Sequence, residues 1–460
     1  MVLLIVRSFC PGTIDVLERQ VVMAIDQFLL NNIWVIIAGL LVFSMVIAVG
    51  FLEIGELGES LNRSLLKTLL IFGTSLFVMA IIGFNTAFAP TIYGVIGNPF
   101  YKEGFFLGFF TSNQLSFINS VWWSSSAQYF ATGLSTSTYF FFETACAAVA
   151  LALVGVVILR KVKLSAFFLF SIAYFIIIWN LPASWVWNPT GWLYELGMRD
   201  FAGGLVIHAS AGAAGLAIMY RIWQEEKKRG LKISSQQPIK VTEGWLALSI
   251  LILLIGWFGF NAGSTLAFNG ASLVAAVTTF LSGAAAMLSA VGVKYAEIRK
   301  NPGILYATNG LLMGLIVITP LAGFVSPGSA VILGLIGGAL FIGGEKLFSS
   351  FKWFSDPVGL TPQHFLGGIF GVSMIAFFTQ NAFASASGNS NLPNGLLFGG
   401  GISAVHQLGI EVLGIVVSLL AVFLVSYVII SIIGAALHGI TEDSEYSAET
   451  KKGPMTSAAK

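Results

Sequence analysis

Long apolar segments, separated by short polar connections, follow one another through most of the chain. A helix of about 17 to 25 mostly apolar residues can cross the hydrocarbon layer of a membrane, which is roughly 30 Å thick. Because lipid offers the backbone no hydrogen-bond partner and these segments lack the alternation of barrel strands, we predict that each is a helix. The eleven predicted spans are residues 33–54, 64–86, 139–159, 164–183, 200–221, 244–265, 270–293, 304–320, 327–345, 364–380 and 408–437.

The composition is typical of a membrane protein rather than a soluble one. Of the 460 residues, 56% are hydrophobic and only 10% are charged, whereas about 25% of the residues in a soluble domain are charged. So few charges cannot cover a soluble globule of this size, and most of the outer surface must therefore face the lipid bilayer. The sequence excludes a soluble enzyme and predicts an all-α polytopic membrane protein with 11 transmembrane helices.

The basic residues are divided unevenly between the two sides of the predicted bundle. Arg7, Arg19, Lys102 and Arg199 lie on one side, and the other Lys and Arg residues, of 23 in all, lie on the opposite side. Because cytoplasmic loops retain Lys and Arg, we predict that the N-terminus is outside and the C-terminus inside (N-out/C-in). That orientation requires an odd number of spans, which the predicted eleven satisfy.

Three parts of the chain lie outside the regular succession of spans. Residues 1–32 are predicted to be an N-terminal extracellular segment, since their apolar start is too short to span and has no convincing cleavage site. Within the transmembrane domain, residues 33–437, the long connection 87–138 is predicted to form an ordered cap over the outer mouth. Residues 438–460 are predicted to be a flexible cytoplasmic tail.

Neither the cysteines nor the net charge indicates a further chemistry. Cys10 and Cys146 are too few and too differently placed for a disulfide framework or a thiolate metal site. The net charge of +2 gives no indication of nucleic-acid binding, so no nucleic-acid partner is expected. No nucleophile, metal-ligand cluster or phosphate loop stands out, and we therefore expect neither an enzyme nor a bound cofactor or metal.

Two segments share the same spacing between an aspartate and a histidine. Asp200 is followed eight residues later by His208, and Asp356 is followed eight residues later by His364. At about 1.5 Å per residue, each histidine lies about 12 Å along from its aspartate, and half of the hydrocarbon layer is about 15 Å. The first pair opens the fifth span from outside and the second opens the tenth span from inside, so both histidines are predicted to approach the midplane from opposite faces.

The mirrored spacing also indicates an internal repeat. Ten spans divide into two halves of five. Because five is odd, the halves must cross the membrane in opposite senses, as they do in inverted-repeat transporters. We therefore predict an inverted 5+5 repeat followed by one additional C-terminal helix.

Each of these residues also has a purely structural interpretation. An aspartate before a helix is commonly its N-cap, and a single histidine within a span can be a hydrogen-bonded packing residue. Two of only four histidines in mirrored motifs favour a shared pore role for His208 and His364. His406 and His438, at the two ends of the last span, are weaker candidates because interfacial solvation explains them.

Four motifs, in this order along the chain, resemble signatures of the ammonium transporter family, the Amt, Mep and Rh proteins. They are DFAGGLVIHASAGAAGL at 200–216, GWFGFNAGS at 256–264, ITPLAGFVS at 318–326 and HFLGGIFG at 364–371. The resemblance covers most of residues 33–437 and is that of a divergent Amt-type member. It implies a homotrimer in the plasma membrane, with a twin-histidine pore in each subunit. It also implies that ammonium is recruited at an outer vestibule and deprotonated, that ammonia crosses, and that in many members the proton crosses too.

The resemblance implies roles for individual side chains. Phe142 and Phe260 resemble the two stacked phenylalanines that close the pore from outside. Trp187 and Ser264 resemble the outer residues that recruit ammonium, and Asp200 resembles the acid that supports that site. A ring face attracts a cation by about 0.5 to 2 kcal/mol, whereas an aromatic belt at the membrane interface is the alternative interpretation.

The chain departs from the family pattern at both ends of the predicted pore. Glu143 and Glu411 stand where the family usually has Gln, and we hypothesise that both increase the attraction of cations at the mouth. Protonation, or pairing with backbone donors, is the alternative. Asp356 is a third candidate modulator, and residues 50–57 replace a Tyr-Gly-Gly-Leu type sequence. The tail lacks the family's Gly-Leu-Asp type motif, so regulation by a PII-family protein is not implied for this chain.

Three functions remain open at this level. The first is an ammonium transporter or ammonia channel. The second is an ammonium sensor that conducts little, which the unusual mouth suggests. The third is an Rh-like electroneutral gas channel, against which the presence of Trp187 and Ser264 argues.

Overall fold

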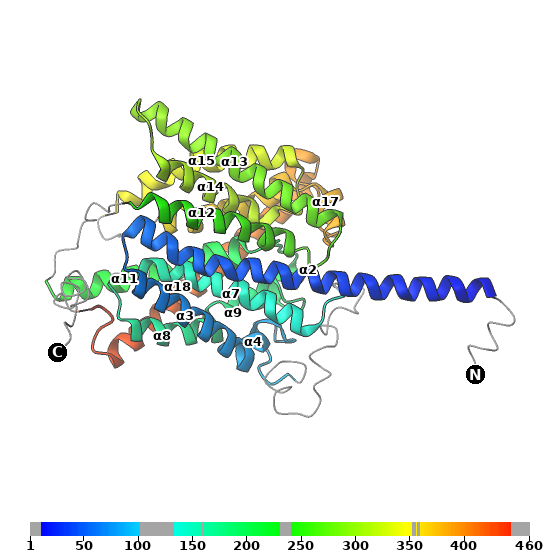
Figure 1. Ribbon diagram of the computed structural model, residues 1–460, viewed down its shortest axis with the longest axis horizontal. Helices are drawn as coiled ribbons and strands as arrows, with labels where there is room; N and C mark the ends of the chain where they lie inside the picture. Colours follow the sequence, from blue (N-terminus) through cyan, green and yellow to red (C-terminus); the bar gives the residue numbers. More distant parts are fainter. Residues whose placement is uncertain are drawn as a thin grey trace, which may run out of the picture.

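The computed structural model describes residues 11–101, 133–158, 161–230, 241–351, 356 and 359–442. The described residues form a bundle of long helices that run side by side (Figure 1). Predictions that concern residues 1–10, the central part of the connection 87–138 and the tail after 442 lie outside the described residues.

The helices follow the succession of apolar segments. Those of the first half are α2 (Pro11–Leu57), α3 (Leu61–Val78), η1 (Met79–Gly83), α4 (Phe84–Phe88), α7 (Thr136–Ile158), α8 (Leu164–Ala173), η2 (Tyr174–Ile178), α9 (Asn180–Val186), α10 (Trp192–Leu196), η3 (Gly204–Ala209) and α11 (Ser210–Lys228). Those of the second half and the C-terminal addition are α12 (Glu243–Trp257), η4 (Phe258–Ala262), α13 (Gly270–Ile298), α14 (Ile304–Ile318), η5 (Thr319–Leu321), α15 (Pro327–Ser349), η6 (Thr361–Phe365), α16 (Leu366–Phe378), α17 (Asn381–Ala386), η7 (Leu396–Phe398) and α18 (Gly401–Ala436).

Within the described residues, 10 continuous helical stretches are long and apolar enough to cross a membrane. They coincide with ten of the eleven predicted spans, and the first belongs to a helix that already begins at Pro11. The remaining prediction, residues 364–380, corresponds to η6 and α16, which follow each other without a break and pack against α14 and α18. Eleven spans and the orientation in the membrane therefore stay predictions.

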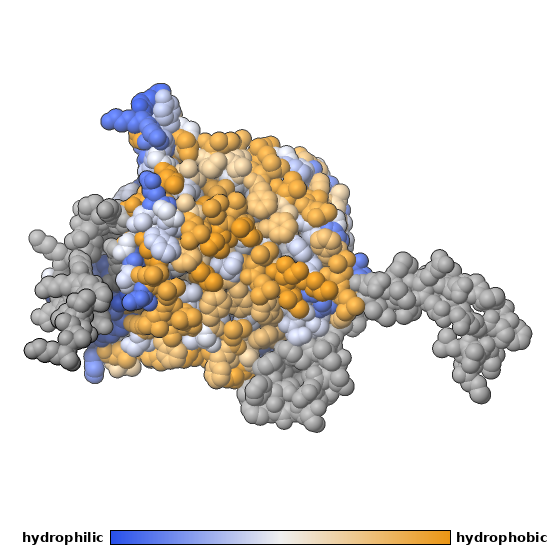
Figure 2. Space-filling view, viewed as in Figure 1, coloured by the Kyte–Doolittle hydropathy of each residue, from blue (hydrophilic) through white to orange (hydrophobic). Residues whose placement is uncertain are grey.

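The outer surface of the bundle matches a lipid environment. Large apolar side chains are exposed on peripheral helices, such as Leu69 on α3, Leu288 on α13 and Leu424 on α18. Figure 2 shows an apolar middle zone on the visible face, with hydrophilic residues gathered mainly toward one end. Since an aqueous surface would not favour such a broad apolar zone, this surface is suited to contact with lipid.

A short β-hairpin follows α4. Strands β1 (Thr91–Ile92) and β2 (Ile96–Gly97) pair antiparallel. The hairpin is attached to the segment after α9 by the backbone N–H of Thr91, which donates to the Thr190 hydroxyl (2.8 Å). The Asn188 amide donates to the carbonyl oxygens of Ala87 (2.9 Å) and Ala89 (2.7 Å), which lead into the hairpin. The described part of the predicted cap is thus a small ordered structure at one end of the bundle.

A buried ion pair joins α2 to α3. Glu53 on α2 and Lys67 on α3 pair with each other while their side chains are 0% and 2% exposed. The Ser64 hydroxyl donates to the second oxygen of Glu53 over 3.0 Å. Charges removed from water need such partners, so this pair fixes the position of α3 along α2.

The segment after α18 returns to the end of the bundle formed by α3, α8 and α11. The Glu225 carboxylate accepts hydrogen bonds from the backbone of Ile440 (3.0 Å) and Thr441 (3.1 Å). Lys163 donates to the carbonyl oxygens of Leu437 and Gly439. These contacts fasten residues 437–442 to the helix ends.

Candidate functional site

Two histidines meet inside the bundle. The Nδ1 atoms of His208 and His364 are 3.1 Å apart, and the ring centroids are 5.1 Å apart. His208 is completely buried and His364 is 7% exposed. Because a neutral imidazole has one donor and one acceptor nitrogen, one ring donates across this contact and the other accepts. The structure therefore brings the histidines of the two mirrored motifs into direct contact.

Each histidine lies on a π-helical turn that begins near its aspartate. His208 belongs to η3 and His364 to η6, and both turns continue directly into α-helices. The Asp200 carboxylate accepts hydrogen bonds from four backbone N–H groups, those of Gly203, Gly204, Leu205 and Val206, over 2.7 to 3.0 Å. The Asp356 carboxylate likewise accepts from the backbone of Leu360 (3.0 Å) and Thr361 (2.6 Å). Both carboxylates thus accept hydrogen bonds from backbone N–H groups at the start of the histidine turns, although the N-cap residues of η3 and η6 are Gly203 and Leu360.

The two aspartates lie at opposite ends of the bundle. Asp356 interacts electrostatically with Glu56 at the C-terminal end of α2. Asp200 lies beside Ser264 in one cavity, at the end where Asn31 of α2 accepts a hydrogen bond from Phe268. Asn31 and Glu56 are about 37 Å apart along α2 at the usual helical rise. The histidines are thus reached from opposite ends.

Glycines let the two histidine turns pack against the opposite half of the chain. A Cβ atom on Gly368 of α16 would lie 2.3 Å from the carbonyl oxygen of Gly204 in η3. A Cβ atom on Gly212 of α11 would lie 2.5 Å from Cβ of Phe365 in η6. The contacts are reciprocal, since each half supplies a glycine to the histidine turn of the other.

Aromatic rings surround His208. Trp257 is stacked with it at 5.4 Å between centroids, and Phe260 lies at 5.9 Å. The Trp257 indole N–H donates to the Thr319 hydroxyl, which holds the ring in this position. In the part of the chain that the structure describes, Nε2 of His208 has no hydrogen-bond partner.

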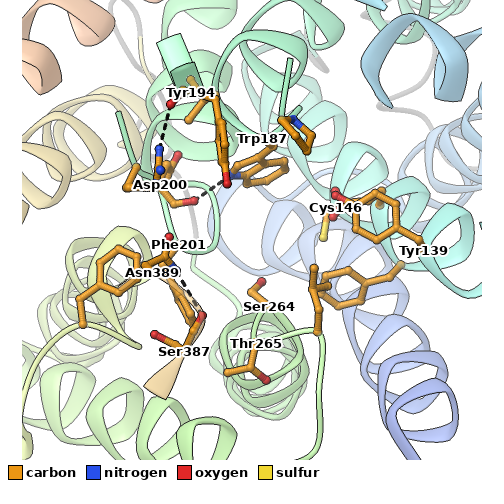
Figure 3. Close-up of a pocket in the computed structure, with 17 residues that line it drawn as sticks. Tyr139, Cys146, Trp187, Tyr194, Asp200, Phe201, Ser264, Thr265, Ser387 and Asn389 are labelled. Atoms are coloured by element: carbon orange, nitrogen blue, oxygen red, sulfur yellow. Dashed lines mark hydrogen bonds between the residues drawn. The ribbon is translucent and has the colours of Figure 1, made fainter. Parts of the chain in front are cut away.

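A cavity of about 80 Å³ lies at the Asp200 end of the bundle (Figure 3). About 10 to 15 Å³ of such space is enough for one water molecule, so a small ion fits. The cavity is lined by Tyr139, Phe142, Glu143, Cys146, Val186, Trp187, Pro189, Tyr194, Arg199, Asp200, Phe201, Ser264, Thr265, Leu266, Phe324, Ser387 and Asn389.

The residues predicted to recruit a cation share this cavity. Trp187, Ser264 and Asp200 all line it, and the Trp187 indole donates to the Asp200 carbonyl oxygen over 2.7 Å. The Ser264 hydroxyl donates to the carbonyl oxygen of Phe260 over 2.8 Å. Phe260 therefore connects the cavity wall to His208, which its ring contacts.

The two predicted gate phenylalanines are arranged differently from expectation. Phe142 lines the cavity and is buried. Among the described aromatic rings, Phe260 pairs with His208 and Trp257 and is not stacked on Phe142. Phe142 instead packs beside Gly263: a Cβ atom built on Gly263 would lie 2.9 Å from the Phe142 ring. Both rings lie on the way to His208, but they do not form the expected stack.

The two unusual glutamates have different surroundings. Glu143 lines the cavity, accepts a hydrogen bond from the Tyr139 hydroxyl, and keeps Oε2 without a partner among the described residues. Glu411 on α18 is fully buried, accepts from the Gln407 amide (2.6 Å) and the Arg199 backbone N–H (3.2 Å), and is not among the residues that line the cavity.

Arg199 is a cavity residue whose role the sequence did not suggest. Its guanidinium lies 4.1 Å from the centroid of the Tyr194 ring and donates to the carbonyl oxygens of Tyr194 (3.0 Å) and Met198 (2.7 Å). Its place directly before Asp200 was the one available signal. Trp257 was also missed as a partner of His208, although it lies within the GWFGFNAGS motif.

The Asp200 carboxylate at the cavity is held in place by its backbone hydrogen bonds. Burial raises the pKa of the Asp200 carboxyl above its usual value, while its four backbone donors favour the ionised form. Because those donors occupy both oxygens, Asp200 shapes the site rather than offering a free ligand.

The arrangement suits a small polar molecule that can become neutral. A charged group is costly to carry through apolar surroundings, whereas a neutral hydrogen-bonding molecule can exchange bonds with imidazole nitrogens. The cavity offers ring faces and polar oxygens to a cation, and the histidine pair beyond Phe260 offers only neutral partners.

The sequence matches the model of the Ammonium Transporter Family over residues 33–451. It is similar to an ammonium transporter of Bacillus subtilis, with 32% identity over 301 residues, covering 65% of this chain and 70% of that protein. It is also similar to an ammonium transporter of Aquifex aeolicus, with 29% identity over 411 residues and 88% of both proteins covered.

Solved structures share the fold. A protein described as a sensor Amt protein has a TM-score of 0.77 and 25% identity, covering 94% of this chain and 99% of that one. Mep2 of Saccharomyces cerevisiae has a TM-score of 0.74 and 24% identity, covering 91% of this chain and 88% of its own.

Proposed function

The chain belongs to the ammonium transporter family, and on that premise we propose that it carries ammonium across the plasma membrane by passing ammonia through a twin-histidine pore. Members of this family are multi-pass membrane proteins that act in ammonium transport or sensing. In the proposed path, ammonium enters the cavity lined by Trp187 and Ser264, loses a proton, and passes Phe260 as ammonia to reach His208 and His364.

The observation that carries this proposal is the buried Nδ1 contact between His208 and His364. The pair lies beyond a polar cavity and is enclosed by Trp257 and Phe260. Such surroundings disfavour a cation and accept a neutral molecule that donates and accepts hydrogen bonds. The unpartnered Nε2 of His208 is an available partner for that molecule.

The test is a transport measurement in liposomes. An ammonium pulse is applied to wild-type protein and to the His208→Ala and His364→Ala variants, with electrical current and internal pH recorded together. His406→Ala is the matched control, because His406 lies on α18 with an exposed side chain. We expect ammonium-dependent flux in the wild type and the control, and at least a tenfold loss in both pore variants, which corresponds to about 1.4 kcal/mol.

The two signals separate the modes of transport. Sustained current means that the proton accompanies ammonia, and alkalinisation without current means an electroneutral channel of the Rh-like kind. Flux that is unchanged in both pore variants would refute the twin-histidine path.

A second candidate function is ammonium sensing. It is favoured by the similarity to the sensor Amt protein over 94% of this chain. A sensor would bind ammonium at the cavity and show neither current nor alkalinisation. Ammonium-dependent thermal stabilisation of the purified protein without flux would identify this function, since ligand binding to the folded state raises stability.

We also propose that the protein assembles as a homotrimer, as the family resemblance implies. Exposed apolar side chains such as Leu69, Leu288 and Leu424 provide surfaces for lipid or for neighbouring subunits. The mass of the detergent-solubilised complex, determined by native mass spectrometry, tests the subunit number. Regulation by a PII-family protein is not part of this proposal.

A further inference from the structure

The cavity contains one acidic oxygen that the fold leaves free. Glu143 on α7 is 5% exposed and lines the cavity. The Tyr139 hydroxyl, one helical turn earlier, donates to the carboxylate, while Oε2 has no hydrogen-bond partner among the described residues. An unpartnered carboxylate oxygen in a buried position is unfavourable unless a ligand supplies the missing partner or the group takes up a proton.

The other acidic groups nearby cannot offer such an oxygen to the cavity. Both oxygens of Asp200 are held by backbone N–H groups. Glu411 is fully buried and accepts from Gln407 and Arg199 on Oε1; its Oε2 also has no partner among the described residues, but Glu411 does not line the cavity. Of Asp200, Glu143 and Glu411, Glu143 alone lines the cavity with an acceptor oxygen that has no partner among the described residues.

The one basic side chain in the cavity lining is engaged elsewhere. The Arg199 guanidinium donates to two backbone carbonyl oxygens and lies over the Tyr194 ring. The remaining titratable groups of the lining are Tyr139, Tyr194 and Cys146, none of which is a cation. Arg199 therefore does not pair with Glu143, and the Glu143 carboxylate has no cationic partner among the side chains that line the cavity.

We propose that Glu143 accepts the proton of ammonium in this cavity. An N–H bond of ammonium breaks, its electron pair stays on nitrogen, and the proton bonds to Oε2 of Glu143, so that ammonia and a neutral carboxyl result. Two buried charges become two neutral groups, which lowers the cost of desolvation before ammonia passes Phe260. The carboxyl then releases the proton to water. This inference rests on the proposed function for the fate of ammonia, but the proton transfer itself does not depend on flux.

Infrared difference spectroscopy tests the proton transfer directly. Ammonium is added to wild-type protein in lipid, and the carbonyl band of a protonated carboxyl is followed, with potassium as the cation that carries no proton. The variants are Glu143→Gln, Glu143→Asp and Glu195→Gln, the last changing an exposed acid of α10 as a control. We expect ammonium, but not potassium, to produce the band in the wild type, in Glu143→Asp and in Glu195→Gln, and the band to be absent in Glu143→Gln.

Flux measurements distinguish a proton acceptor from a group that merely attracts cations. A proton acceptor predicts that Glu143→Gln lowers the maximal rate about tenfold or more, with a half-saturating ammonium concentration that changes less than about threefold, since general base catalysis is commonly worth ~10²-fold. Simple attraction predicts the opposite: a raised half-saturating concentration at an unchanged maximal rate.

Two outcomes would overturn the proposal, and a third separates it from the proposed transport function. A carboxyl band that persists in Glu143→Gln assigns the proton to another group. A change confined to the half-saturating concentration limits Glu143 to attraction. If the wild type shows no flux but the band appears and requires Glu143, the transport proposal fails while the proton acceptor stands. Glu143→Asp, together with size-exclusion profiles of all variants, shows whether a lost band reflects misfolding.

Discussion

Single residues on the same cavity wall have separate tasks. Asp200 gives all its acceptor capacity to the backbone of η3 and thereby sets the position of His208. Glu143 gives only part of its capacity to Tyr139. Both are buried acids at the same mouth, so residue type alone does not separate a structural acid from a reactive one. The geometry of hydrogen bonding does.

Removing the Asp200 carboxylate should lower the stability of the fold, because the carboxylate binds the backbone rather than the substrate. Asp200→Ala leaves four backbone N–H groups without their acceptor, and loss of an N-cap alone costs up to about 2 kcal/mol. Asp200→Asn retains one side-chain acceptor oxygen and is expected to be intermediate. Thermal unfolding of the protein in detergent measures the effect. An Asp200→Ala protein as stable as the wild type would show that these bonds contribute little.

Elements show where the sequence was sufficient and where it was not. The lengths of the apolar segments identified the spans, because a helix that crosses lipid needs only enough consecutive apolar residues. The helical stretch that contains most of the segment 364–380 begins with the polar Thr361 and Gln363, which lower the mean hydropathy of the stretch although α16 itself is apolar. The π-helical form of η3 and η6 was not predictable, since it depends on capping by an aspartate and on packing against the other half.

The sequence was sufficient to predict the two histidines of the candidate site, but not the contacts of the residues around them. Mirrored spacing was enough to pair His208 with His364, because helical rise fixes depth. The orientation of Glu411 could not be predicted, since it depends on how α18 is rotated relative to Arg199. The same holds for the gate, where rotation of η4 turns Phe260 toward His208 rather than onto Phe142.

The close packing between α16 and η3 should not tolerate even one methyl group at Gly368. Gly368→Ala places a Cβ atom 2.3 Å from a backbone oxygen of Gly204. Overpacking typically costs about 1 to 3 kcal/mol, and because the shift reaches η3 we expect flux to fall as well. Gly343→Ala is the control, since nothing lies within 4 Å of its Cβ position. Both effects are read from thermal unfolding and liposome flux, and equal behaviour of the two variants would contradict the packing argument.

The ion pair between α2 and α3 should behave as one unit. Lys67→Met alone leaves the Glu53 carboxylate buried without its cation, which is expected to cost about 3 to 5 kcal/mol. The double variant Glu53→Gln with Lys67→Met removes both charges and should recover much of that loss. A double-mutant cycle on thermal unfolding measures the coupling, and additive losses would mean that the two charges do not depend on each other.

The whole molecule is held together at its helix ends as well as in its core. Glu225 on α11, Lys163 before α8 and Arg63 on α3 all bind the segment after α18, with Arg63 and Glu442 2.7 Å apart. That segment therefore links helices from widely separated parts of the chain. Its position depends on these polar contacts together with the burial of Ile440, whose side chain is 0% exposed.

Glu225→Ala should release the C-terminal segment without unfolding the bundle. The substitution removes the acceptor of the Ile440 and Thr441 backbone groups, and the segment is then expected to be cleaved several-fold faster by a protease. Limited proteolysis followed by mass spectrometry measures the cleavage after α18. Lys228→Ala, an exposed change on the same helix, is the control. Unchanged cleavage in Glu225→Ala would show that the other contacts suffice.

The reciprocal glycine contacts and the histidine pair make the two halves of the chain complementary rather than redundant. One half carries His208 and the glycine that receives η6, and the other carries His364 and the glycine that receives η3. A fragment ending near residue 230 and a fragment starting near residue 241 would each hold one histidine of the pair. Co-expression of the two fragments is thus a natural split reporter: conduction would mark their reassembly, and neither fragment could evolve its pore surface without the other.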